Sequence, residues 1–396
     1  MIVLSGGRLV LPDRVVEGGS LLIEGGHIAG VEPRPLDRVA NATVRSMAGL
    51  TVVPGFIDVH VHGVDGIDLL DDDGAVARVA ARLPRYGVTA FCPTSVACEA
   101  ASLDAFLAAV GTAQAAAAPD SARVLRAHLE SNFINPAWAG AQPPAHLRRP
   151  DGTGDVQADA FTAADIRRVL AARAAVIGIV TLAPELPGAL DLVRELAARG
   201  HVVAMGHTGA SYEEARAAIE AGVTHATHLF NRMTPLTHRE PGVVGAVLES
   251  PTVVAELICD GQHVHPAAVA LAARVKSVER AIAITDASAC AGLPVGARAR
   301  LGGQPIIATE RGARLENGTL AGSVATMDAA FRMLVGEAGL PLVDAARMCA
   351  TTPARQLGLG RRGRLAKGHA ADLVVLDEHL RVVQVWIDGR VVAEPT

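Results

Sequence analysis

The sequence predicts an α/β fold, a (β/α)8 TIM-like barrel with a small β-sandwich domain that both chain termini build together. Three observations support this prediction. The chain has 396 residues, which suffices for a barrel of roughly 250 residues with additions. Eight short apolar runs alternate with segments of helical periodicity in its middle. Both ends instead carry short β-rich runs separated by glycine turns.

The two ends of the chain resemble each other. The first 50 residues contain short apolar runs, and the Gly-Gly pair at 25–26 is typical of a hairpin. The last segment, ADLVVLDEHLRVVQVWIDGRVV, carries a second hairpin signal, the Asp-Gly pair at 388–389. We therefore expect one small domain from residues 1–53 and 355–396 around a barrel at 54–354. The chain ends should then lie close together.

The middle of the chain alternates apolar runs with segments in which apolar residues recur every three to four positions. Continuously apolar runs indicate strands buried on both faces, as in a closed parallel barrel. A doubly wound open sheet is the alternative, but the eight runs and the absence of GxGxxG after the first favour the barrel. The runs cover residues 51–63, 87–96, 122–131, 174–185, 200–210, 222–231, 252–264 and 280–289. Expected helices cover residues 75–87, 102–116, 165–174, 189–200, 211–222, 267–277, 323–339 and 341–358.

Composition excludes several classes of protein. The net charge is −5, the pI is near 6.3 and aromatic residues make up 3%, so no nucleic-acid partner is expected. No apolar run is long enough to cross a bilayer, and the N-terminus lacks the pattern of a signal peptide. We therefore expect a cytoplasmic protein with no membrane partner. The cysteines are odd in number and form no CxxC pair, which predicts reduced thiols: Cys92, Cys98, Cys259, Cys290 and Cys349.

Polar residues close nearly every predicted strand. Active sites of (β/α)8 barrels lie at the carboxyl ends of the strands, so these residues are candidates for catalysis. Two of them, in the sequence His60-Val61-His62, point to one face of a strand, and paired neutral imidazoles suit a divalent metal ion. The full set is His60, His62, Glu130, His207, His228, His263 and Asp286.

Each of these residues also has a purely structural interpretation when taken alone. A lone strand histidine is often hydrogen-bonded in the core, Glu130 could pair with an arginine, and Asp286 could be a helix N-cap. Such residues occur at six strand ends, and six unrelated structural explanations are less probable than one metal site that uses them together. We interpret His128, His225 and His265 as structural residues or as supports for the ligands.

Several longer stretches of the sequence resemble one family. They are PGFIDVHVHG, HLESNFINPAWAGAQ, GHTGASYEEA, THLFNRMTP with HREPG, DGQHVHP, ITDA and GTLAGS, in this order. Together they resemble the N-acetylglucosamine-6-phosphate deacetylases over essentially the whole length of the chain. A later stretch, GRLAKGHAADLVVLD, is similar to amidohydrolases in general and supports that superfamily.

The resemblance implies a set of metal ligands. Glu130, His207 and His228 are expected to hold the ion that this family always contains. Some members replace the HxH pair and use one ion, whereas this chain keeps His60 and His62, so one or two ions are expected. Zinc is the favoured metal, with iron, manganese or cobalt as alternatives.

The resemblance also implies roles in the reaction. Asp286 resembles the catalytic acid/base, and His263 resembles the residue that polarises the acetamide carbonyl and contacts the substrate. Asn231 and Arg239 resemble phosphate contacts. Gln142 stands where some members carry a phosphate-contacting histidine. A homodimer is expected on the same basis.

The chain has only two lysines, Lys276 and Lys367, and neither is on a predicted barrel strand. This excludes the amidohydrolases that bridge two metal ions with a carbamylated lysine. Glu130 is therefore expected to supply the carboxylate.

The expected reaction is metal-dependent hydrolysis of the acetamide of N-acetylglucosamine 6-phosphate to glucosamine 6-phosphate and acetate. A metal ion lowers the pKa of water, which makes attack on an amide feasible at neutral pH. After the metal-binding glutamate this family has Gly-Pro, whereas this chain has Ser131-Asn132. A deacetylase of N-acetylgalactosamine 6-phosphate or of another N-acyl amino sugar is therefore an alternative. A non-catalytic amidohydrolase-like scaffold is a third interpretation, which the intact ligand set disfavours.

Overall fold

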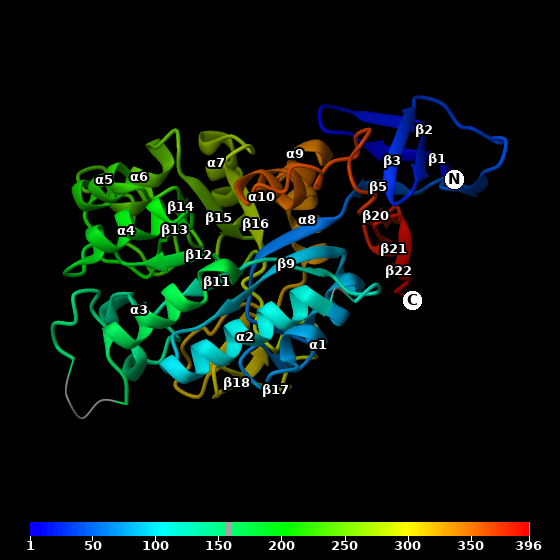
Figure 1. Cartoon of the computed structure of the whole chain (residues 1–396). Coiled ribbons are helices and arrows are strands. Elements are labelled where there is room, and N and C mark those ends of the chain that lie inside the picture. Colours follow the sequence, from blue (N-terminus) through cyan, green and yellow to red (C-terminus); the bar gives the residue numbers. More distant parts are fainter. Residues whose placement is uncertain (117, 156–159, 396) are drawn as a thin grey trace.

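Eight parallel strands form a barrel at the centre of the molecule, as the sequence predicts (Figure 1). The structure is a computed structural model, which describes residues 1–116, 118–155 and 160–395. Hydrogen bonds join the strands in sequence order, and the barrel closes where Val61 pairs with Ala287. The strands are β6 (Phe56–Val61), β9 (Val88–Ser95), β11 (Ala127–Glu130), β12 (Ile177–Leu182), β13 (Val202–Met205), β14 (His225–Ala226), β15 (Val254–Ile258) and β16 (Ala281–Ile284).

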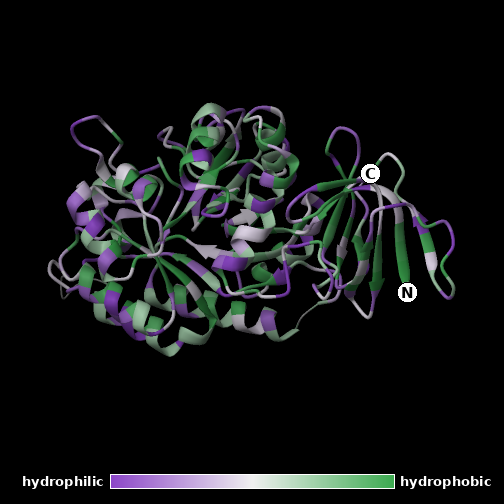
Figure 2. Cartoon of the chain, turned by 90° about the horizontal axis from the view of Figure 1, so that it is seen from above, coloured by the Kyte–Doolittle hydropathy of each residue, from purple (hydrophilic) through white to green (hydrophobic). Residues whose placement is uncertain are grey.

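Helices surround the barrel, and Figure 2 shows hydrophobic strands converging inside this ring. Every residue of β6, β9, β12 and β15 is buried, as expected for strands that are covered on both faces. The sequence of α3 and α5 also marks where each helix begins, because a capping box closes the N-terminus of both. The helices are α1 (Ala75–Arg82), α2 (Ala100–Ala116), α3 (Ala163–Ala172), α4 (Ala189–Ala198), α5 (Tyr212–Ala221), α7 (Pro266–Lys276), α8 (Met327–Gly336), α9 (Leu342–Ala346) and α10 (Thr352–Gln356).

One helix, α6 (Gly242–Glu249), has no counterpart among the predicted helices. Its sequence GVVGAVLE is almost wholly apolar, and six of its residues are buried. A helix that is buried all round shows no amphipathic period. Lys276, at the end of α7, is itself buried and donates from Nζ to the carbonyls of Val247 and Ser250, at 2.8 and 2.5 Å, where α6 ends.

The polar and glycine-rich segment after β16 forms a small antiparallel sheet of three strands, β17 (Arg298–Leu301), β18 (Gln304–Thr309) and β19 (Gly312–Leu315). Two leucines at its edges, Leu301 and Leu320, line the pocket that the barrel opens into. This sheet therefore covers part of the pocket mouth.

Both chain ends build one mixed sheet of eight strands beside the barrel (Figure 1). The sheet curls, because the amide of Ile28 donates to His369 O at 2.8 Å and that of Ala371 donates to Gly26 O at 2.9 Å. A hydrophobic core fills the inside of the curl, with Trp386 as its largest side chain. The strands are β1 (Ile2–Val10), β2 (Val15–Glu24), β3 (His27–Glu32), β4 (Thr43–Ser46), β5 (Thr51–Pro54), β20 (Leu373–Leu376), β21 (Val382–Ile387) and β22 (Arg390–Ala393).

The first predicted strand, residues 51–63, divides between the two parts of the molecule. Its first half, β5, pairs with β1 and β20 of the curled sheet, and its second half, β6, belongs to the barrel. Gly55 lies between them, and a Cβ there would lie 2.3 Å from Thr89 Oγ1. A side chain at position 55 would thus collide with the second barrel strand.

The structure also places the cysteines and the lysines. All five cysteines are buried free thiols. Among the described residues, no helix is long and apolar enough to cross a membrane. Neither lysine lies on a barrel strand, since Lys276 ends α7 and Lys367 lies in a turn before β20.

Candidate metal and catalytic site

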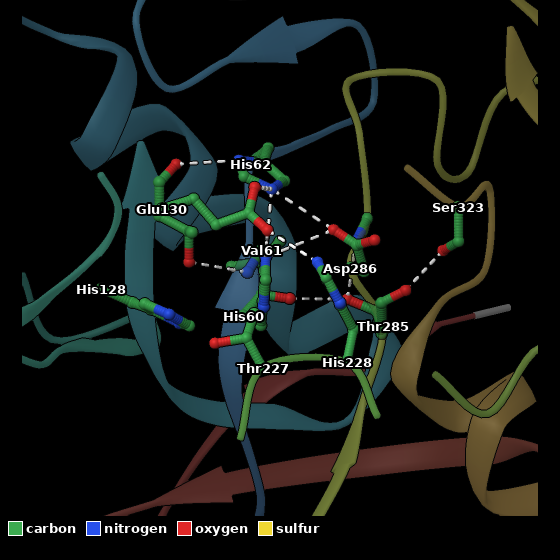
Figure 3. A network of polar contacts seen from close by, with 12 residues as sticks. His60, Val61, His62, His128, Glu130, Thr227, His228, Thr285, Asp286 and Ser323 are labelled. Carbon is green, nitrogen blue, oxygen red and sulfur yellow. Dashed lines mark hydrogen bonds and ion pairs between the residues drawn. The ribbon is translucent and has the colours of Figure 1, made fainter. Parts of the chain in front are cut away.

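Four histidines and two carboxylates meet at the carboxyl ends of the barrel strands. Figure 3 shows five of these residues together: His60, His62, His228, Glu130 and Asp286. The six residues come from five different strands or the turns directly after them, as the sequence predicts. They form two groups, each of which could hold a metal ion. The groups are His60, His62 and Asp286, and Glu130, His207 and His228.

The Glu130 carboxylate lies between the two groups. Its Oε1 is 2.9 Å from His207 Nε2 and 2.8 Å from His228 Nε2. Its Oε2 is 3.6 Å from Nε2 of His62, which in turn lies 3.3 Å from Asp286 Oδ1. One carboxylate therefore faces both sets of donors.

The outer hydrogen bonds of the histidines leave Nε2 lone pairs facing the centre. Nδ1 of His62 donates to Thr94 O at 3.2 Å and Nδ1 of His207 donates to Trp138 O at 2.9 Å. A carbonyl accepts only, so Nδ1 of each of these rings carries a proton. His60 Nε2 lies 3.1 Å from His62 Nε2, and the His207 and His228 Nε2 atoms lie 3.0 Å apart. Converging lone pairs and carboxylates fit divalent cations, with the outer acceptors fixing each ring.

The electrostatics of the group point the same way. Burial opposes protonation of His60, but Glu256, Asp286 and Glu130 outweigh it and raise its pKa to about 10. Burial likewise disfavours charge on Glu130, yet the adjacent histidines, His207 foremost, hold the pKa of that carboxyl well below its usual range. A buried carboxylate is stable in its charged form only beside positive charge, and a divalent metal ion would supply that charge here.

The backbone at this site adopts rare conformations. His207, His228 and Asp286 have φ angles of 49°, 32° and 49°, in the left-handed region that side chains with a Cβ disfavour. Hydrogen bonds hold Asp286 there, because its amide donates to His60 O at 3.0 Å and its carbonyl accepts from Ser323 N at 2.7 Å. Such strain is concentrated at functional sites, where the surrounding structure holds it in place.

Glu256, in the middle of β15, is a central residue that the sequence analysis missed. Its side chain is fully buried below the donor groups. It accepts from His60 Nδ1 at 3.0 Å and from His225 Nε2 at 2.9 Å. The available signal was a lone carboxylate inside the apolar run VVAELIC, which needs a buried partner.

His263 and Asp260 form a second missed pairing. Nδ1 of His263 donates to Asp260 Oδ2 at 2.6 Å, which leaves Nε2 for the pocket that His263 lines. Burial opposes the imidazolium form, but the bond to Asp260 outweighs it and raises the pKa of His263. A protonated His263 can donate to a carbonyl oxygen.

The expected phosphate contacts divide into two cases. Asn231 lines the pocket, close to the backbone carbonyls of His228 and Leu229. Arg239 lies on an exposed loop between β14 and α6 and is not among the described residues that line the pocket. The arginine that does line it is Arg232, which the sequence analysis did not single out.

Gln142 has both ends of its amide engaged within the protein. It donates through Nε2 to Glu130 Oε2, and its Oε1 accepts from Ala97 N at 2.7 Å. Its amide therefore positions the metal-site carboxylate instead of standing free for a phosphate. The expected contact between Gln142 and substrate stays a prediction.

The side chains of Ser131 and Asn132, which replace the Gly-Pro of the family, also make their hydrogen bonds within the protein. Ser131 Oγ donates to Thr181 O at 2.5 Å, and Asn132 Nδ2 donates to Cys98 O at 2.7 Å. Both side chains are buried, and neither is among the described residues that line the pocket. They fix the path of the loop after β11.

Three further histidines that the sequence analysis considered make hydrogen bonds within the protein. His128 is fully buried, its Nδ1 donates to Val59 O at 3.0 Å, and burial lowers its pKa to about 3. His225 donates to Glu256, and His265 caps α7 by accepting from Ala267 N.

A (β/α)8 barrel with histidines and carboxylates at its strand ends is an arrangement typical of barrel enzymes that can bind divalent metals. Comparison with known sequences makes this specific. The chain belongs to the amidohydrolase family, whose profile matches residues 51–392.

Named relatives confirm the predicted resemblance to amino-sugar-phosphate deacetylases. An N-acetylglucosamine-6-phosphate deacetylase of Lysinibacillus sphaericus is 37% identical over 87% of this chain and 86% of its own. An N-acetylgalactosamine-6-phosphate deacetylase of Escherichia coli O157:H7 is 36% identical over 98% of both chains. The N-acetyl-D-glucosamine-6-phosphate deacetylase D267A mutant from Mycobacterium smegmatis, solved in complex with N-acetyl-D-glucosamine-6-phosphate, superposes with a TM-score of 0.89, 35% identity and 99% coverage of both chains.

Proposed function

We propose that this chain hydrolyses the acetamide of N-acetylglucosamine 6-phosphate to glucosamine 6-phosphate and acetate. The observation that carries the proposal is the convergence of four histidine Nε2 atoms on Glu130 and Asp286 at the base of a pocket. Relatives that carry this activity in their names span nearly the whole chain. N-acetylgalactosamine 6-phosphate is a second candidate, because a relative named for that sugar is equally similar.

The donor residues form two groups, and each group would hold its own metal ion. Glu130, His207 and His228 would hold one ion, and His60, His62 and Asp286 would hold a second, with Glu130 facing both. A divalent ion in such a site acts as a Lewis acid that makes water acidic enough to attack an amide near neutral pH. We propose zinc as the ion, because imidazole and carboxylate ligands suit it.

The protein's own residues then move protons and stabilise charge. Asp286, held by His60 O and Ser323 N, would accept a proton from the attacking water and pass it to the departing amine. His263, oriented by Asp260, would donate from Nε2 to the acetamide oxygen as negative charge develops there. The amine of glucosamine 6-phosphate leaves with the proton from Asp286, and the acetic acid that forms loses its own proton to solvent and becomes acetate.

Further features of the proposal concern the whole molecule. Asn231 and Arg239 would contact the phosphate, although Arg239 is not among the described residues that line the pocket. The homodimer and the cytoplasmic location remain predictions.

A panel of paired substrates tests the function. Protein loaded with zinc, iron, manganese or cobalt is assayed for acetate release from N-acetylglucosamine and N-acetylgalactosamine, each with and without the 6-phosphate, and bound metal is measured in parallel. We expect the 6-phosphates to be preferred, with activity lost on chelation and regained with metal. The proposal is wrong if both phosphates remain intact while an unphosphorylated amide is cleaved.

A further inference from the structure

The described lining of the pocket contains one permanent positive charge. Among the described residues that line it, Arg232 is the only arginine or lysine. Its side chain is exposed, and within the described part of the chain its guanidinium has neither a hydrogen bond nor an ion pair. The N–H donors of this guanidinium are therefore available to an anionic group of the substrate.

A constrained turn connects Arg232 to the metal-site histidine four positions earlier. His228, Phe230 and Arg232 all have left-handed φ angles, of 32°, 80° and 51°. The amide of Asn231 donates to His228 O at 2.9 Å, and the amide of Thr208 donates to Arg232 O at 3.0 Å. The Arg232 side chain therefore starts from a defined place relative to His228.

Gly140, in the loop after β11, makes room for this arginine. A Cβ at position 140 would lie 2.8 Å from Nε of Arg232, and the φ of Gly140 is +63°. Gly140 also lines the pocket. The side chain of Arg232 thus lies against the backbone of a second pocket loop, which limits where its guanidinium can go.

We propose that Arg232 binds the phosphate of the substrate within the same chain and thereby sets the preference for phosphorylated amino sugars. This inference rests on the proposed function. A guanidinium presents parallel N–H donors that match two phosphate oxygens, and no carboxylate of the described chain competes for those of Arg232. Arg232 is in the described lining of the pocket and Arg239 is not, so the geometry favours Arg232 for this role.

The test compares Arg232→Gln and Arg232→Lys with Arg239→Gln, which removes the other arginine of the same loop region. The exposed Arg168→Gln, outside the described lining of the pocket, is the control. For each protein, kcat and KM are measured on N-acetylglucosamine 6-phosphate and on N-acetylglucosamine. We expect Arg232→Gln to lower kcat/KM for the phosphorylated sugar at least tenfold, mainly through KM, and to lower that for the unphosphorylated sugar far less. Arg232→Lys should fall between, because it keeps the charge and loses the fork.

A second readout does not depend on turnover. Inorganic phosphate is titrated into the metal-loaded protein by calorimetry, and we expect its Kd to rise at least tenfold in Arg232→Gln. An unchanged preference and an unchanged phosphate Kd in Arg232→Gln would overturn the inference. So would loss of both in Arg239→Gln alone. Failure of the proposed function looks different, because the unmodified enzyme would then release no acetate from either 6-phosphate.

Discussion

The carboxylate of Glu256 accepts a hydrogen bond from Nδ1 of His60 at 3.0 Å and so leaves Nε2 of that imidazole directed at the donor cluster. Both side chains are fully buried, so the pair has no access to solvent. Carboxylates that hold a ligating histidine by its outer nitrogen fix the tautomer and the ring orientation.

Replacing Glu256 by glutamine should therefore weaken one metal ion selectively. We expect Glu256→Gln to lower affinity for the ion held by His60, His62 and Asp286 by roughly ten- to a hundredfold, the range for loss of such outer partners. Metal analysis across a chelator series measures this as a fall in stoichiometry. Glu220→Gln, at an exposed glutamate, is the control. Retention of two ions with unchanged affinity would contradict the role.

Asp286 is expected to be required for turnover. Asp286→Asn keeps the size of the side chain but removes its ability to accept a proton, so we expect kcat to fall by about two to four orders of magnitude. The ion at Glu130, His207 and His228 should remain, since that group does not include Asp286. Acetate release and metal content are measured together, with exposed Asp191→Asn as the control. A rate near that of the unmodified enzyme would mean that another base acts.

The left-handed backbone at His207 predicts an unusual order of stabilities. At its φ of 49° glycine is favoured over alanine, so metal-free His207→Gly should be more stable than metal-free His207→Ala by about 1 kcal/mol. Urea unfolding in the presence of chelator measures the difference. His60, on strand β6 with ordinary φ, is the control, where glycine should be the less stable by about 0.5–1 kcal/mol. The same order at both positions would contradict backbone strain at His207.

Lys276 predicts a pH-dependent contribution to stability. Burial lowers its pKa from 10.5 to about 8, so the unfolded chain binds the proton more tightly than the folded one. Its contribution is present above pH 10.5 and is lost as the pH falls to 8. The unfolding free energy of the protein minus that of Lys276→Met should thus rise from pH 8 to 10.5, by urea unfolding.

The other lysine of the chain is a matched control. Lys367 is exposed, so the difference between the protein and Lys367→Met should stay flat over the same pH range. A flat difference for Lys276→Met as well would mean that the carbonyls of Val247 and Ser250 keep the ammonium charged.

Much of the fold could be predicted because the barrel strands are continuously apolar and glycine often ends the helices. Helix α6 could not, since its burial on all sides removes the periodicity that marks a helix. The sheet β17–β19 was also missed. Its strands are short. Buried and more exposed residues alternate along β18, so the segment contains no continuously apolar run.

The metal ligands could be predicted because parallel strands bring their carboxyl ends together, whichever residues lie between them. Glu256 lies in mid-strand and is recognisable only through its histidine partners. Arg232 and Arg239 are seven residues apart in one loop, and the sequence alone does not tell which turns toward the pocket. The direction of each side chain depends on the backbone conformation of residues 228–232. Left-handed φ angles and hydrogen bonds to distant residues fix that conformation.

The interleaving of the termini also has a consequence for biosynthesis. Strand β5 leads directly into the first barrel strand and takes its place between β1 and β20. One edge of β5 therefore stays unpaired until residues 373–376 have emerged from the ribosome. The barrel strands all precede β20 in the sequence, so they can be synthesised before this edge of β5 has its partner. Removal of β20 by truncation should consequently leave an unpaired edge of β5 beside the start of the barrel, where another chain could pair with it.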